Sequence, residues 1–88
     1  MVKKKVKILN KLGLHARPAA QFVKISSKYK CKVDIDKDGF EINAKSIMGV
    51  MMLAAEYESS ITIKCSGPDE QECLEALTKL VDDKFYEE

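Results

Sequence analysis

The chain contains one histidine, His15, within the segment Gly13-Leu14-His15-Ala16-Arg17-Pro18-Ala19-Ala20. Imidazole is the side chain most easily kept neutral and nucleophilic near neutral pH, and the first N–H groups of a helix bind anions. Arg17 adds a guanidinium fork that suits phosphate oxygens, and Pro18 fits the first turn of a helix. The segment therefore predicts a phosphoryl acceptor at the start of a helix.

If His15 carries phosphate, the backbone amides of Ala16 and Arg17 and the Arg17 side chain can stabilise the charge. Catalysis of phosphoryl transfer depends mostly on positioning and electrostatic stabilisation. The helix dipole favours neutral imidazole before transfer and the phosphate dianion after it. A lone histidine before a helix is also common as a surface residue or a cap, and Arg17 could be an ordinary solvated residue. The residues alone leave both interpretations open.

A second segment of interest is Lys45-Ser46-Ile47-Met48-Gly49-Val50-Met51. Ser46 is most simply the N-cap of a short helix, with its hydroxyl accepting from an amide one turn on. A phosphate on Ser46 would lie at the positive end of the helix dipole, so it would act on partners rather than melt the helix.

The short helix after Ser46 has more apolar side chains than it can bury. Helical spacing predicts that Val50 and Leu53 face inward and that Ile47, Met48 and Met51 are at least partly exposed. The exposed set is either a loosely packed edge of the core or an adaptable docking patch built from methionines.

The elements that position these residues follow from apolar periodicity, which switches between two and about 3.6. We expect strands at about 2–9, 31–36, 40–44 and 61–65, and helices at about 16–28, 46–53 and from 67 to the region of Lys84. The Asp38-Gly39 pair lies between two alternating runs and predicts a hairpin. The resulting order, βαββαβα, defines an α+β fold in which helices cover one sheet face and solvent the other.

The composition limits the function classes. At 88 residues the chain is a single domain, 1–88. With 15 basic and 14 acidic residues, net charge gives no reason to expect nucleic acid or a membrane as a direct partner. The lysines near the N-terminus lack interleaved aromatic residues, which argues against RNA binding. No apolar run approaches a membrane span and no signal-peptide pattern opens the chain, so we expect a cytoplasmic location.

The three cysteines, Cys31, Cys65 and Cys73, are odd in number and have no CxxC spacing. Strand-like and helix-like patterns place all three in the core, reduced, and we expect neither a disulfide framework nor a metal site. A small hydrolase that pairs His15 with a cysteine is an alternative, and it requires one of the thiols to approach the imidazole.

The two segments around His15 and Ser46 resemble the active-site and regulatory-serine segments of the HPr family, the histidine-containing phosphocarriers of the bacterial sugar phosphotransferase system. The resemblance covers essentially all 88 residues. It implies an open-faced β-sandwich with a four-stranded antiparallel sheet and three helices on one face. It also implies a carrier rather than an enzyme, without a cofactor. In such a carrier, enzyme I phosphorylates His15 at Nδ1, with phosphoenolpyruvate as original donor, and His15 passes the group to enzyme IIA domains of sugar permeases.

The resemblance further implies that an ATP-dependent HPr kinase/phosphorylase modifies Ser46, which weakens exchange with enzyme I and favours the catabolite control repressor protein. It implies a monomer that receives its partners on one overlapping surface, formed by Ala20, Lys24, Ser27, Ile47, Met48 and Met51. The stretch Ala54-Ala55-Glu56 stands where many members have a glycine near the end of the second helix, which leaves the end of that helix undefined. The alternative is a regulatory HPr-like binding module without a carrier role, although such relatives lack the active-site histidine.

Overall fold

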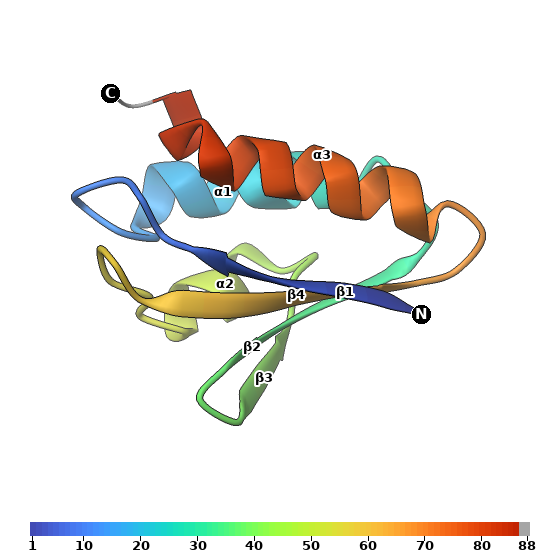
Figure 1. The fold of residues 1–88 in the computed structure, drawn as a ribbon, viewed down its shortest axis with the longest axis horizontal. Helices are drawn as coiled ribbons and strands as arrows, with labels where there is room; N and C mark the ends of the chain where they lie inside the picture. The colour runs from blue at the N-terminus through green and yellow to red at the C-terminus, as the bar shows by residue number, and fades with distance from the viewer. Residues whose placement is uncertain (87–88) are drawn as a thin grey trace.

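The structure, a computed structural model, describes residues 1–86 and has the predicted order of elements (Figure 1). The strands are β1 (Val2–Lys7), β2 (Lys32–Lys37), β3 (Phe40–Asn43) and β4 (Ser60–Ser66). The helices are α1 (Ala16–Ser26), α2 (Ile47–Met52) and α3 (Glu70–Asp82), followed by a short 3-10 turn, η1 (Lys84–Tyr86). The strands form one antiparallel sheet in the order β1-β4-β2-β3. The predicted α+β open-faced sandwich is confirmed.

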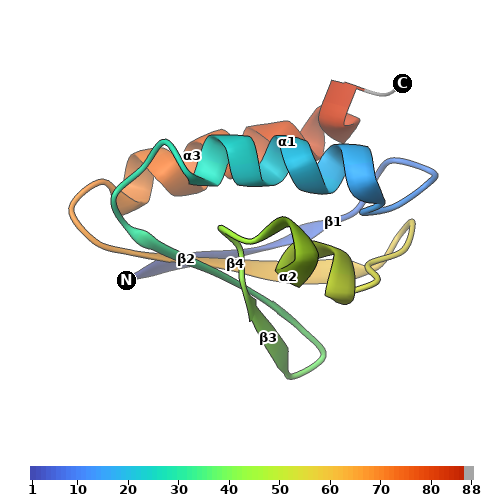
Figure 2. The ribbon, with the colours of Figure 1, turned by 180° about the vertical axis from the view of Figure 1, so that it is seen from behind.

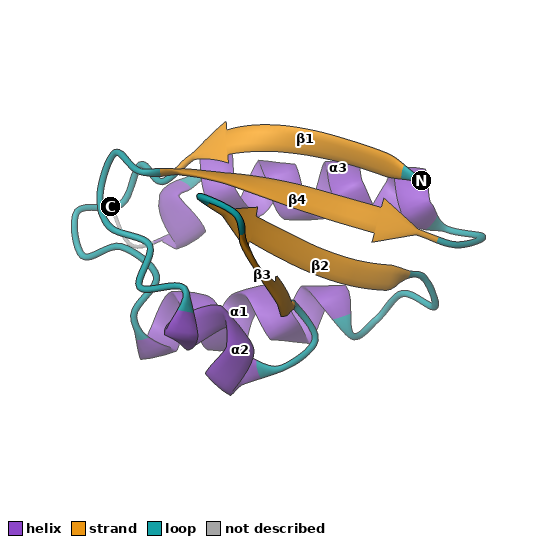
Figure 3. Cartoon of the chain, turned by 90° about the horizontal axis from the view of Figure 1, so that it is seen from below, coloured by secondary structure: helices purple, strands orange, loops and turns teal. Residues whose placement is uncertain are grey.

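The sheet has a covered face and an open face. Helices α1 and α3 lie side by side across the covered face, and α2 lies against α1 and β3 at the side of this layer (Figures 1 and 2). Figure 3, a view from below, shows β1 and β4 in front of α3, and α2 in front of α1. Alternate strand residues point between the layers, including Ile35 and Ile63, and meet Phe22 and Leu77, all fully buried. Across residues 1–86, none of the helices has the length and apolarity needed to cross a lipid bilayer.

The β2–β3 hairpin forms at the predicted turn. Asp38 and Gly39 have φ angles of 53° and 87°, and the flanking residues Lys37 and Phe40 pair across the strands. Positive φ at both central positions defines a type I′ turn, whose backbone twist matches the twist of the flanking strands. The Gly39 N–H donates to Oδ1 of Asp36 at 2.9 Å, which closes the turn.

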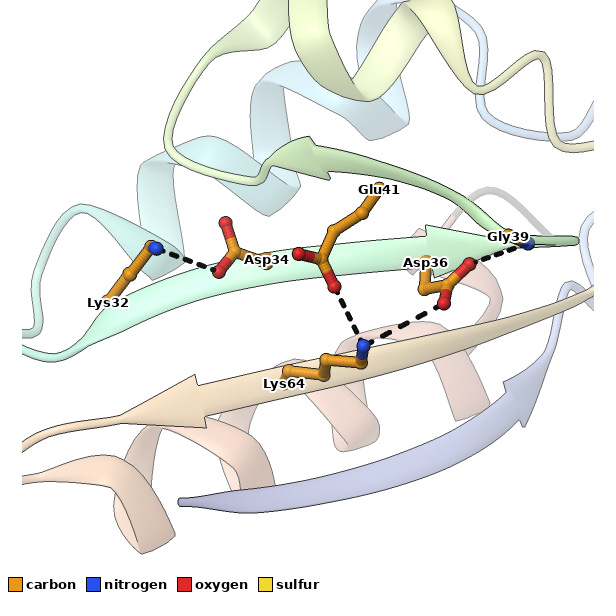
Figure 4. Close-up of polar contacts among 6 residues, drawn as sticks. All are labelled: Lys32, Asp34, Asp36, Gly39, Glu41 and Lys64. Atoms are coloured by element: carbon orange, nitrogen blue, oxygen red, sulfur yellow. Dashed lines mark hydrogen bonds and ion pairs between the residues drawn. The ribbon is translucent and has the colours of Figure 1, made fainter.

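Charge pairs occupy the open face of the sheet (Figure 4). The Lys64 ammonium donates to Oε1 of Glu41 at 2.7 Å and lies 3.7 Å from Oδ2 of Asp36. The hydrogen bond to Glu41 raises the pKa of Lys64. Lys32 lies 3.7 Å from Oδ2 of Asp34. Such exposed pairs add little stability, but they make this face compatible with water.

The ends of several elements differ from the prediction. Helix α1 ends at Ser26, and α3 ends at Asp82, so Lys84 lies in η1 rather than in the helix. Phe85, which the periodicity did not place, is fully buried with φ 55°. Helix α2 ends through Ala54, whose φ of 50° is left-handed. That conformation favours glycine, so Ala54 terminates the helix with backbone strain that a glycine would avoid.

Candidate functional site

His15 is the N-cap residue of α1. Its backbone is extended, with φ −76° and ψ −171°, and its carbonyl accepts the first bond of the helix from the Ala19 N–H at 3.0 Å. The side chain makes no capping hydrogen bond and is half-buried. The backbone of His15 therefore starts the helix while its imidazole is not used as a cap.

The first turn of α1 directs backbone N–H groups toward the region of His15. The first N–H groups of a helix have no carbonyl partner within it. Here they belong to Ala16 and Arg17, because the third helical residue, Pro18, has no N–H and the Ala19 N–H is already used. Together with the dipole, they form an anion-binding helix end next to the histidine. The Arg17 side chain is exposed in the same turn.

The loop before His15 is fixed to the chain that follows α2. The Leu14 N–H donates to the Ala55 carbonyl at 2.9 Å, and Nδ2 of the buried Asn10 donates to the Gly13 carbonyl at 2.6 Å. Gly13 has φ 69°, and a Cβ there would lie 2.5 Å from the Ala55 carbonyl oxygen. Only glycine combines this conformation with this close approach. The position of His15 thus depends on a contact between two loops.

A surface hollow of about 530 Å³ lies beside His15, between these two loops. Its other lining residues are Lys11, Leu12, Leu14, Ala54, Ala55, Glu56 and Tyr57. Leu12 and Tyr57 are 75% and 48% exposed. The sequence interpretation missed these residues as part of the site, because the loop after α2 reaches the histidine only through the tertiary fold. The hollow gives a group on another molecule room to approach the imidazole.

The predicted partner surface is exposed and apolar on α2. The exposed fractions are 44% for Ile47, 75% for Met48 and 43% for Met51, whereas Val50 and Leu53 are buried. Both parts of the prediction for this helix are confirmed, and Met52, which was not placed, is also 64% exposed. On α1 and its C-cap, the exposed residues include Ala20, Lys24 and Ser27. The two helices pack against each other (Figure 2), so these side chains belong to neighbouring elements.

Ser46 caps α2 as predicted. Its Oγ accepts from the Gly49 N–H at 3.1 Å, and its carbonyl accepts from Val50 at 3.0 Å. The buried Ser26 donates from Oγ to the Ala44 carbonyl at 2.8 Å, which ties the segment before Ser46 to α1. A buried hydrogen bond therefore joins the histidine helix to the segment two residues before the cap.

The three cysteines are buried and free, as predicted, but they also form a cluster that the sequence did not predict. The three Sγ atoms lie within 4.8 Å of one another. Burial raises the pKa of the Cys65 thiol to about 11. Burial, with the neighbouring Cys65 and Cys31 thiols, holds the pKa of Cys73 well above its usual range. The thiols of Cys65 and Cys73 are consequently neutral at physiological pH.

The cysteine cluster lies away from His15. Cys65 pairs with Val2 at the beginning of β1, whereas the opposite end of β1, at Lys7, leads toward His15. None of the cysteines lines the hollow beside the imidazole. The hypothesis of a hydrolase that pairs His15 with a cysteine is therefore wrong.

An open-faced β-sandwich with a histidine at the N-terminus of its first helix defines a class of small phosphocarrier domains. Residues 2–83 match the family model PTS-HPr, described as the PTS HPr component phosphorylation site. The chain belongs to the HPr family.

Known members of the family are similar to this chain over nearly their full length. The phosphocarrier protein HPr of Treponema pallidum is 46% identical over 88 residues, which cover 100% of both chains. An HPr-like protein Crh from Halalkalibacterium halodurans is 48% identical over 82 residues, covering 93% of this chain and 98% of the relative. The crystal structure of HPr-C-His from Thermoanaerobacter tengcongensis superimposes with a TM-score of 0.96 at 43% identity, covering 100% of this chain and 99% of the other.

Proposed function

We propose that this protein accepts a phosphoryl group on His15 from phosphorylated enzyme I and passes it to enzyme IIA domains of sugar permeases. The observation that carries the proposal is the placement of His15 at the N-cap of α1 with its side chain outside the capping network. Membership of the HPr family supports the same role.

The transfer itself is a displacement at phosphorus. The lone pair of Nδ1 in the neutral imidazole attacks, and a new N–P bond forms as the bond between phosphorus and the donor group breaks. The Ala16 and Arg17 N–H groups and the Arg17 guanidinium stabilise the oxygens that carry the charge. The same step in reverse, toward an acceptor on the IIA domain, discharges the carrier, so this stabilisation has to remain moderate.

Partners dock on the face formed by α1 and α2, which we call the docking face: Ala20, Lys24, Ser27, Ile47, Met48 and Met51. The proposal is supported by the exposure of the apolar α2 side chains and by the contact between the two helices. Methionines suit a surface that receives several partners in turn, because their flexible side chains adapt to different shapes. One chain contains both His15 and the docking face, and in the proposal the carrier acts as a monomer.

Ser46 provides regulation in the proposal. Phosphorylation by an HPr kinase/phosphorylase would add about −1.5 to −2 charges next to Ile47 at the edge of the docking face. The charge would weaken exchange with enzyme I and favour the catabolite control repressor protein. Similarity to Crh, which is described as the Bacillus subtilis catabolite repression HPr, supports a regulatory branch. The second candidate function, a regulatory module without carrier activity, rests on that similarity.

The experiment is a relay assay with labelled phosphoenolpyruvate, enzyme I and an isolated IIA domain. Wild type carries label to the IIA domain, and His15→Ala carries none. Met48→Asp slows the transfer at subsaturating carrier, because it puts charge into the docking face. Phe40→Asp, an equally drastic change at a 48% exposed residue of the hairpin, leaves the rate unchanged. Equal rates for the two aspartate variants would contradict the docking face. Label on Ser46 from a cognate kinase, with none ever on His15, would favour the second candidate.

A further inference from the structure

The cysteine cluster has the geometry of a coordination site. Cys31 precedes β2, Cys65 belongs to β4 and Cys73 to the first turns of α3, and the fold brings their Sγ atoms within 4.8 Å of one another. An atom at the centre of a triangle with that side would lie about 2.8 Å from each sulfur, against about 2.3 Å for a zinc–thiolate bond. Each sulfur therefore has to move inward by about 0.5 Å to bond an atom in the plane of the triangle, and farther to bond an atom above that plane.

The burial of the cluster and its number of ligands determine which metal or metalloid it can bind. The three residues are at most 1% exposed, and no fourth histidine, cysteine or carboxylate of residues 1–86 joins the group. Tetrahedral zinc would lack its fourth ligand, and three thiolates around a divalent or monovalent ion would leave net negative charge in the core, which is costly. Trivalent arsenic binds three thiolates with no net charge, and its lone pair occupies the fourth direction.

We propose that Cys31, Cys65 and Cys73 form a buried three-thiol binding site for trivalent arsenic. Arsenous acid reacts with the three thiols: three As–S bonds form, three As–OH bonds break, and each hydroxyl leaves as water with one thiol proton. Arsenic stays trivalent, so the reaction needs no oxidant or reductant. The site is separate from the phosphoryl-accepting histidine and does not depend on the carrier function.

The loop between β4 and α3 covers Cys31, so in the proposal arsenite enters when this loop opens. Gly67 packs directly on Cys31, since a Cβ on Gly67 would lie 2.7 Å from the Cys31 Cα. The Asp69 carboxylate holds this loop closed by accepting from the backbone N–H groups of Lys30 and Cys31 at 2.8 and 2.9 Å. Asp69→Asn loosens this contact, so arsenite should react several-fold faster with that variant while the final stoichiometry stays the same.

The test uses the full chain, kept reduced with a phosphine because dithiols compete for arsenic, and sodium arsenite as the probe. Native mass spectrometry should show one adduct that adds one arsenic atom and removes three hydrogens. Binding to the folded state should raise the midpoint of thermal unfolding by roughly 5–10 °C at saturating arsenite. No adduct on the folded protein, or a midpoint that falls because only the unfolded chain binds, would overturn the proposal.

Variants separate the site from a general effect of thiols. Cys73→Ala and Cys65→Ala each leave two sulfurs and should lose the thermal shift. Val33→Ala, which shortens another fully buried side chain of the same sheet, keeps all three sulfurs and should retain it. Retention of the full shift by both cysteine variants would contradict a three-thiol site. Should a cysteine variant fail to fold, the sign of the wild-type shift still decides the question.

Discussion

The close approach of Gly13 to Ala55 predicts that two identical glycine substitutions will have unequal effects. Gly13 and Gly39 both have left-handed backbones, with φ 69° and 87°. A Cβ at Gly39 meets nothing within 4 Å, whereas at Gly13 it would lie 2.5 Å from the Ala55 carbonyl oxygen. Gly39→Ala is therefore a matched control that contains the backbone strain without the collision.

The magnitudes follow from the two contributions. An alanine in the left-handed region costs about 1–2 kcal/mol, and about 0.4–1 kcal/mol of this is offset by lower entropy of the unfolded chain. Gly39→Ala should therefore lower the unfolding free energy by about 1 kcal/mol. At Gly13 the loops must also separate, which removes the Leu14–Ala55 hydrogen bond of 2.9 Å, worth about 1 kcal/mol or more. Gly13→Ala should cost about 2–3 kcal/mol in total.

The assay is thermal or urea unfolding of the three proteins, followed by phosphorylation by enzyme I. Gly13→Ala should unfold about 5–10 °C below Gly39→Ala, since 1 kcal/mol corresponds to about 4–8 °C in a domain of this size. The displaced loop should also slow phosphorylation of His15, while Gly39→Ala remains normal. Equal stabilities and equal rates would refute the claim that the contact between the two loops positions the histidine.

Three further predictions concern single residues. Ala54→Gly should raise the unfolding free energy by about 0.5–1 kcal/mol, because it removes the left-handed strain at the end of α2; destabilisation in urea would contradict this. Arg17→Lys keeps the charge but loses the planar fork, so the rate of phosphorylation by enzyme I should fall about tenfold, and a near-normal rate would argue against the role of the fork. Hydrogen bonds from the Lys30 and Cys31 N–H groups lower the pKa of Asp69, so its stabilising effect is present above about pH 4 and lost as the pH falls through its folded pKa. Asp69→Asn should flatten the dependence of stability on pH in that acidic range, and an unchanged acid slope would refute it.

Local signals predicted most of the fold. A two-residue hairpin turn of this kind needs positive φ at both central positions, which an Asp-Gly pair tolerates. The structure has that turn at Asp38 and Gly39. Ser46 is a favoured cap, and its hydroxyl accepts the expected bond from Gly49. Both features depend on residues within a few positions of one another, which is the range over which sequence patterns are informative.

Features that depend on tertiary contacts were not predicted. The Ala55 carbonyl meets Gly13 only because the loops after β1 and α2 converge, and no local pattern records that approach. Burial of each cysteine followed from periodicity, but their proximity depends on the register between strands and on where α3 begins. Phe85 is buried through an unusual left-handed turn after α3, which lies outside any helical or strand repeat.

The most direct test of the account is intact mass spectrometry after incubation with phosphoenolpyruvate and enzyme I, with His15→Ala as the control. Wild type should carry a single acid-labile phosphoryl adduct and His15→Ala none. Acid lability distinguishes a phosphohistidine from a phosphoserine. Absence of the adduct on wild type, or an adduct of equal yield on His15→Ala, would contradict the assignment of His15 as the phosphoryl acceptor.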